Sequence, residues 1–199
     1  MVAVSGHREL PGVTNIILNH AKAARCALEH LSALGHRKIA LIKGQAFSSD
    51  TEVRWESVRQ TARHMNLPIR DRLVGQLEGE SSSPELGYAV TRKLLNAGEP
   101  FTALFAFNDI SAIGAIRALR EGGRRVPEDV SVVGFDDIQS AAFQNPGLTT
   151  VRQPLRHMGE IAAETLLRRI AAPPKSPYPK SITVEPELIV RASTAKAPA

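Results

Sequence analysis

The sequence has few of the features that mark secreted or membrane proteins. Of its 199 residues only Cys26 is a cysteine, so no disulfide can form within the chain. Cys26 stands beside Ala27 and Leu28 on a predicted helix, which is typical of a small core residue. No apolar run is long enough to cross a bilayer, and the first residues lack the regions of a signal peptide. We therefore expect a cytoplasmic protein that does not associate with a membrane.

Positive charge is not concentrated in the way that nucleic-acid binding requires. The chain carries 25 lysines and arginines against 20 acidic residues, a net charge of +5. Its one basic cluster, at Arg117, Arg120, Arg124 and Arg125, is interrupted by Glu121. No helix-turn-helix pattern, zinc-ligand spacing or alternation of basic and aromatic residues accompanies it. We interpret these basic residues as a solvated face.

The motifs of common enzymes are missing as well. The loop at Gly44 lacks the Gly-Lys-Ser/Thr ending that holds phosphates, and neither Gly-x-Gly-x-x-Gly nor Gly-x-Ser-x-Gly occurs after a strand. Asp136 and Asp137 are adjacent at a strand end, where neighbouring side chains point in different directions, which argues against paired catalytic carboxylates. The six histidines, at positions 7, 20, 30, 36, 64 and 157, show no metal-ligand spacing. We expect no catalytic residue, no cofactor and no metal.

What the sequence does contain is a regular alternation of strand and helix patterns. Continuous apolar segments predict strands near residues 38–42, 72–77, 101–107 and 130–135. Helical spacing predicts helices between these strands, and a further helix at 154–170 that ends in a break at 171–174. Apolar residues alternate over 182–190 and predict a last strand, which Pro186 places at an edge or a bulge. This order predicts an α/β fold with a single parallel, Rossmann-like sheet and helices on both of its faces.

Polar side chains follow three of the predicted strands. Arg54 lies in the first turn of the helix after the strand at 38–42, and Asn108 and Asp136 directly follow two later strands. Ligands of parallel sheets bind at the carboxyl ends of strands, so these groups are candidates for binding hydroxyls or a heterocycle. The alternative is structural: Arg54 would be a surface residue and Asn108 a turn residue. For Asp109 and Asp137 we favour the structural role, in which each caps the helix that follows it.

Four segments of the chain resemble the lactose/galactose-repressor family of bacterial transcription regulators. They are Leu34–Ile42 (LGHRKIALI), Phe105–Ala115 (FAFNDISAIGA), Arg125–Asp137 (RVPEDVSVVGFDD) and Leu148–Pro154 (LTTVRQP). They occur in the order and with the spacing of the family, over nearly the whole chain. The resemblance implies a periplasmic-binding-protein-like (type I) core, in which two lobes hold a ligand between them.

The resemblance also implies how the chain divides between these lobes. Residues 19–146 and 181–192 match a complete second lobe, whereas residues 1–18 and 148–170 match remnants of a first lobe that is mostly missing. The N-terminal helix-turn-helix through which the family binds operator DNA is missing from this chain. By itself, the chain is therefore not expected to bind operator DNA.

The same resemblance implies an effector-binding function without catalysis. Arg54, Asn108, Asp136 and Gln153 match the positions that contact a small-molecule effector, such as a sugar or a related metabolite. Effector binding would shift the population of lobe arrangements and thereby control DNA binding by a homodimer. The predicted helix at 109–121 and the stretch 138–143 resemble the dimer surfaces of the family. The loop at 78–83 lacks the aromatic residue that often stacks on a sugar or base, which disfavours a simple hexose or purine.

Two alternative functions remain at this point. A periplasmic sugar-binding protein of a transporter would share the fold but needs a signal peptide, and an enzyme with a similar sheet needs catalytic motifs.

The helix at 154–170 carries an apolar stripe that another chain would cover or that would be left exposed; it consists of Ile161, Ala162, Thr165, Leu166 and Ile170.

Overall fold

A six-stranded sheet forms the centre of the larger part of the molecule. The computed structural model describes residues 1–173 and 176–198, so the predicted break at 171–174 lies partly outside the described residues. The strand order is β4-β3-β5-β6-β7-β9, and the first five strands are parallel. Their bounds are β3 (Ile39–Lys43), β4 (Val74–Gln76), β5 (Ala103–Phe105), β6 (Ser131–Asp136), β7 (Thr149–Arg152) and β9 (Glu187–Ile189). The predicted α/β fold class is confirmed.

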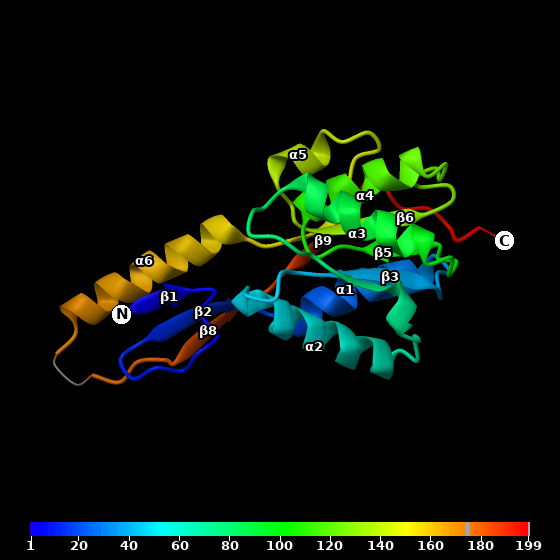
Figure 1. The fold of residues 1–199 in the computed structure, drawn as a ribbon. Coiled ribbons are helices and arrows are strands. Elements are labelled where there is room, and N and C mark those ends of the chain that lie inside the picture. Colours follow the sequence, from blue (N-terminus) through cyan, green and yellow to red (C-terminus); the bar gives the residue numbers. More distant parts are fainter. Residues whose placement is uncertain (174–175, 199) are drawn as a thin grey trace.

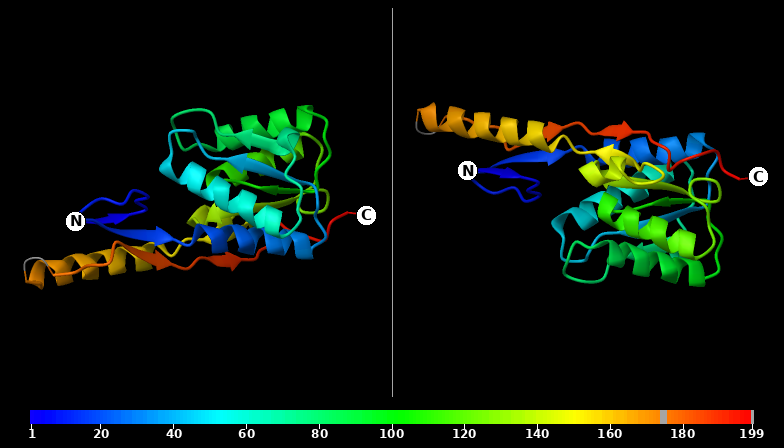
Figure 2. Two further views of the ribbon diagram at one scale, coloured as in Figure 1. Left: turned by 90° about the horizontal axis from the view of Figure 1, so that it is seen from below. Right: turned by 90° about the horizontal axis from the view of Figure 1, so that it is seen from above.

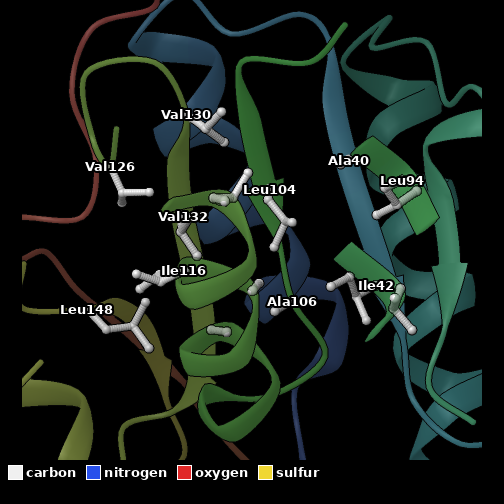
Figure 3. Close-up of a cluster of buried hydrophobic side chains, with 14 of the residues drawn as sticks. Ala40, Ile42, Leu94, Leu104, Ala106, Ile116, Val126, Val130, Val132 and Leu148 are labelled. Carbon is white, nitrogen blue, oxygen red and sulfur yellow. The ribbon is translucent and has the colours of Figure 1, made fainter. Parts of the chain in front are cut away.

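Helices cover both faces of this sheet, which explains why its strands are continuously apolar. On one face lie α1 (His20–Ala33) and α2 (Ser49–His64), and on the other α3 (Pro84–Asn96) and α4 (Asp109–Glu121). The 3-10 turn Asp71–Leu73 precedes β4, and the short helix α5 (Gln139–Ala142) follows β6. Figure 3 shows the core beneath α3 and α4, where Leu104, Val132 and Ile116 meet with almost no exposed surface.

A second, smaller sheet extends from this body (Figures 1 and 2). It consists of β1 (Val2–Val4), β2 (Thr14–Leu18) and β8 (Ser181–Val184), all parallel, in the order β1-β2-β8. The long helix α6 (Leu155–Ala171) packs against β1 and β2. The core of this part is small: Ile16, Met158 and Val184 are its buried apolar residues.

The four strands predicted for one parallel sheet all lie in the large sheet, but the predicted last strand divides between the two sheets. Its first half, β8, pairs with β2 in the small sheet, and its second half, β9, runs antiparallel to β7 at the edge of the large sheet. Pro186 lies between the two halves and lacks the N–H that a continuous strand needs. Residues 181–184 therefore do not join the larger part as predicted, and β7 does not join the smaller one.

Helix α6 leaves much of its apolar surface exposed among the described residues. Ile161 and Ala162 of the predicted stripe contact the small core, together with the fully buried Met158 that the prediction omitted. Leu166, Leu167 and Ile170 are 43%, 65% and 72% exposed. No helix in the described part of the chain is both long and apolar enough to span a membrane.

Candidate functional site

Arg54 is the centre of a polar cluster at the carboxyl ends of the strands of the large sheet. The loop after β3 leads into α2, whose second turn carries Arg54 inward, so that its side chain is only 11% exposed. The guanidinium carbon lies 4.0 Å from the ring centroid of Phe135 and 4.6 Å from that of Phe107. Its Nη1 donates a hydrogen bond of 2.9 Å to the carbonyl oxygen of Phe107, at the end of the neighbouring strand. Burial lowers the pKa of Arg54, and the charges of Asp136 and Asp50 oppose that shift.

Asp136 completes the cluster from the end of β6. Its Oδ1 lies 3.8 Å from Nη2 of Arg54 and accepts a hydrogen bond from the side-chain amide of Gln153. Burial raises the pKa of Asp136, and the charge of Arg54 works against that rise. The backbone of Asp136 has φ = 110°, a conformation that costs on the order of 1–3 kcal/mol for a residue with a side chain. Strain of this kind is concentrated at binding sites, where the surrounding structure holds a side chain in place.

Asn108 lies beside this cluster, but its side-chain oxygen has a structural role. Its Oδ1 accepts a hydrogen bond of 2.9 Å from the backbone N–H of Ser111 and caps the start of α4. The hydroxyl of Ser111 in turn accepts from the backbone N–H of Asn108, which completes a capping box. Asp136 therefore lies next to both Arg54 and Gln153, and Asn108 lies one residue beyond the carbonyl group that Arg54 binds.

The predicted capping roles of Asp109 and Asp137 were wrong. Asp109 is fully buried and accepts hydrogen bonds from the hydroxyl of Thr150 (2.6 Å) and the backbone N–H of Ile138 (2.9 Å), so it connects α4 to β7 and α5. Asp137 forms ion pairs with Arg152 (2.7 Å) and Arg191 (2.6 Å). Neither partner set is local in the sequence, which is why the short-range signal for a cap was misleading.

Comparison with known proteins identifies the family of this chain. The model of the family described as "Periplasmic binding protein-like domain" matches residues 28–194. A dimeric Lac repressor structure superposes with a TM-score of 0.85 at 30% identity, and covers 98% of this chain and 68% of its own. The chain belongs to the LacI family. It forms part of the effector-binding core of a LacI-family regulator.

Two further relatives carry more specific names. The HTH-type transcriptional repressor PurR of Haemophilus influenzae is 39% identical over 182 residues, which are 90% of this chain and 53% of the relative. A LacI family transcriptional regulator from Enterococcus faecium, solved with bound ribose, has a TM-score of 0.83 at 28% identity and covers 98% of this chain and 70% of its own. The chain thus spans about half the length of the curated relative that it matches. These relatives are transcriptional regulators and not enzymes, which agrees with the lack of catalytic motifs.

Two hollows adjoin the polar cluster of this LacI-family chain. A cavity of about 40 Å³ lies next to Arg54 and is lined mainly by apolar and aromatic groups, including Trp55, Phe107 and Phe135. It has room for only about three or four water molecules, at roughly 10–15 Å³ each. Asp136 and Gln153 also line an open depression of about 600 Å³ at the start of α6. A sugar-sized molecule at Arg54 therefore requires neighbouring side chains, or the two parts of the chain, to move apart.

The loop at 78–83 is exposed and contains no aromatic residue, as the sequence indicates. The side-chain amide of Gln45, in the loop after β3, donates to the carbonyl oxygen of Ser81. The neighbouring Phe47 is 70% exposed. The aromatic surface near the site is therefore supplied by α2 and by the ends of β5 and β6 instead.

Sequence reasoning missed one group of residues next to Arg54. Asp50 lies 3.3 Å from Nη2 of Arg54, through Oδ2, and 2.6 Å from Nε2 of His7, through Oδ1. His20 is also close, because its ring centroid lies 5.6 Å from that of His7. No spacing rule could find this group, since its three members come from three different elements.

Proposed function

We propose that this chain binds a small polar effector at Arg54, Asp136 and Gln153, with Asn108 at the edge of the site. In the intact protein, that binding controls transcription. The effector class is a polyhydroxylated molecule or a related metabolite, because a guanidinium, a carboxylate and an amide together can donate to and accept from neighbouring hydroxyl groups.

The environment of Arg54 is the observation that carries this proposal. A buried arginine normally uses its N–H groups fully, because an unpaired one is costly. Nε of Arg54 is buried and has no hydrogen-bond partner within the described part of the chain. The two carboxylates beside Arg54 hold its guanidinium in place, so the group is preorganised to donate to a ligand.

The relatives support the same conclusion at a coarser level. The Enterococcus faecium regulator was solved with bound ribose, and the Haemophilus influenzae relative is a transcriptional repressor. A periplasmic transport protein shares the fold, but the relatives favour the transcription regulator, which acts in the cytoplasm. Contact with operator DNA would then be made by a helix-turn-helix segment outside this chain.

The mechanism would be a shift between arrangements of the two lobes. An effector that touches Arg54 and Asp136 in the larger part, and residues of the smaller part, favours the arrangement in which both contacts exist. The dimeric Lac repressor neighbour suggests that two copies transmit this change together. By linkage, operator binding would alter effector affinity by the same factor.

Calorimetry with a panel of sugars, polyols and nucleobases tests the proposal on the longest natural form of the protein that contains this chain. Once one compound binds, Asp136→Asn and Arg54→Ala are each expected to weaken binding ten- to hundredfold, which corresponds to about 1–3 kcal/mol for a buried polar group left unpaired. Asp136→Asn is the sharper variant, because it keeps the shape and removes only the charge and one acceptor.

Arg59→Ala is the matched control, since Arg59 lies on the same helix and its side chain is 55% exposed. It should leave affinity unchanged. If both site variants fold and bind as tightly as the parent, the effector binds elsewhere and the proposal fails.

A further inference from the structure

Three side chains from distant parts of the sequence converge beside Arg54. His7 lies in the loop after β1, His20 is the first residue of α1, and Asp50 lies in the first turn of α2. One ring nitrogen from each histidine and one carboxylate oxygen of Asp50 all lie within 4.8 Å of one another. This group brings the small sheet, through His7, into contact with two helices of the larger part.

We propose that His7, His20 and Asp50 form a binding site for a divalent transition metal of the zinc type. Two imidazole nitrogens and one carboxylate oxygen are a donor set that zinc accepts when it keeps a fourth position open. Imidazole donors disfavour Mg²⁺ and Ca²⁺, which prefer oxygen ligands. This inference goes beyond the proposed effector function and does not depend on it.

The distances allow such an ion after small side-chain rotations. Bonds of about 2.0–2.2 Å in a tetrahedral site place the ligand atoms roughly 3.3–3.6 Å apart. Nε2 of His7 and Oδ1 of Asp50, now 2.6 Å apart in a hydrogen bond, would separate by less than about 1 Å to reach that geometry. The largest separation between ligand atoms, which is within 4.8 Å, would shorten by at most about 1.5 Å.

The protonation states also suit a metal. Metals bind the neutral imidazole and the ionised carboxylate. Burial, followed by the charge of Arg54, lowers the pKa of His20 to about 4, so its ring is neutral at pH 7. Burial raises the pKa of Asp50, but the hydrogen bond with His7 and the charge of Arg54 outweigh it, and the net shift is downward. Both groups are therefore in the form that binds a metal.

His20 adds an independent observation. The residue is nine-tenths buried, and its Nδ1 has no hydrogen-bond partner in the described part of the chain. Across the described ranges, Nδ1 of His20 and Nε of Arg54 are the buried side-chain atoms left without a partner. A buried nitrogen of this kind calls for a specific partner, and an ion is one of the species that can supply it.

The nearby positive charge of Arg54 does not block the site. Arg54 binds Oδ2 of Asp50 and leaves Oδ1 on the side of His7. The carboxylate of Asp136, 3.8 Å from Arg54, offsets the guanidinium charge. The arginine would thus orient the carboxylate toward the metal, as partners of ligating carboxylates commonly do.

Calorimetric titration of the full chain with Zn²⁺ alone tests this inference. We expect one zinc ion per chain, and at least about a tenfold loss of affinity in His7→Gln, His20→Gln and Asp50→Asn. Zinc should also raise the melting temperature of the parent and not that of His7→Gln, because a ligand that binds only the folded state stabilises it. Mg²⁺ at the same concentrations should give neither effect.

Two control variants separate this site from adventitious zinc binding. His64→Gln removes an exposed histidine from the C-terminal end of α2, the helix that carries Asp50. Cys26→Ser removes the one thiol of the chain, which lies on α1 outside the proposed site. Both variants should bind zinc as the parent does.

Several results of the zinc titrations would contradict a zinc site at His7, His20 and Asp50. Absence of zinc binding by the parent, unchanged affinity in His7→Gln, or loss of binding in Cys26→Ser or His64→Gln would each overturn the inference. His7→Gln is decisive even if His20→Gln does not fold, because His7 is on the loop after β1 and is not part of the apolar clusters of either sheet. Since no effector is present in these titrations, their failure leaves the proposed effector site untouched.

Discussion

The two sheets of this chain are stabilised very differently. The six-stranded sheet has a buried apolar cluster on each face, whereas the three-stranded sheet shares a small core with one side of α6. Of the 17 residues in α6, Met158 is the one that is buried, and several of the exposed ones are large and apolar. The site at Arg54 is built on the sheet with the larger core, which can hold a strained residue such as Asp136 in place.

Truncation of one core residue in each part should reveal the difference in packing through the largest changes in stability. Leu104 is fully buried under α4. Leu104→Ala should lower the free energy of unfolding of the chain by about 3–5 kcal/mol, since the densely packed surroundings cannot collapse into the cavity. Met158→Ala in the small core should cost about 2 kcal/mol, because several of its neighbours are only partly buried and can relax. Urea unfolding followed by circular dichroism measures both values. Equal losses would show that the two parts are equally well packed.

A pair of glycines extends the comparison to backbone packing. A Cβ at Gly114 in α4 would lie 1.8 Å from the carbonyl oxygen of Pro84 in α3, so Gly114→Ala should destabilise the chain by about 3 kcal/mol. A Cβ at Gly159 in α6 would meet nothing within 4 Å, and Gly159→Ala should instead stabilise the helix by roughly 0.5–1 kcal/mol. Melting temperatures should move in opposite directions. A shift in the same direction for both would contradict the close approach of α3 and α4.

The stability of the larger part should depend on pH through the buried carboxyl of Asp109. Burial is the main cause that raises the pKa of Asp109 to about 6. Below pH 4 the carboxyl is protonated in both states, and its stabilising contribution is fully present; this contribution falls as pH rises through about 6. The total change should be about 3 kcal/mol, because the pKa rises from 3.8 to about 6 and each pKa unit corresponds to about 1.4 kcal/mol. Asp109→Asn should lack this term.

Only the difference between parent and variant isolates Asp109. The pKa of His20 is lowered to about 4, so His20 makes the folded state less stable as pH falls from 6.5 toward 4. This effect is opposite in sign to that of Asp109 over much of the same pH range. Unfolding free energies at pH 4, 5, 6 and 7 give that difference. Parallel pH profiles for parent and Asp109→Asn would show that the carboxyl titrates normally.

The smallest effect is expected on the exposed face of α6. Leu167 is 65% exposed, so Leu167→Gln should change the unfolding free energy by less than about 0.5 kcal/mol. The same change should reduce self-association in sedimentation experiments if a second copy covers this apolar patch. Unchanged association would exclude Leu167 from such a contact.

The strand and helix pattern was predictable because it depends on local periodicity. The strands near 38–42, 101–107 and 130–135 correspond to β3, β5 and β6, and the polar residues at their ends were found by the rule for parallel sheets. The predicted pairing was less successful. Contacts such as β2 with β8 join residues more than 160 positions apart, and no local pattern records them.

Local patterns in the sequence were enough to predict the α/β class, the family and the positions of Arg54 and Asp136 on the side of the carboxyl ends of the strands, since these follow from periodicity and from four contiguous motifs. Tertiary structure alone decided how the last strand divides at Pro186, which partners Asp109 and Asp137 bind, and that His7, His20 and Asp50 meet. The difference arises from the distance along the sequence over which each kind of interaction acts. Backbone propensity and side-chain period act over a few residues, whereas pairing, burial and charge neighbours depend on segments that only the complete fold brings together.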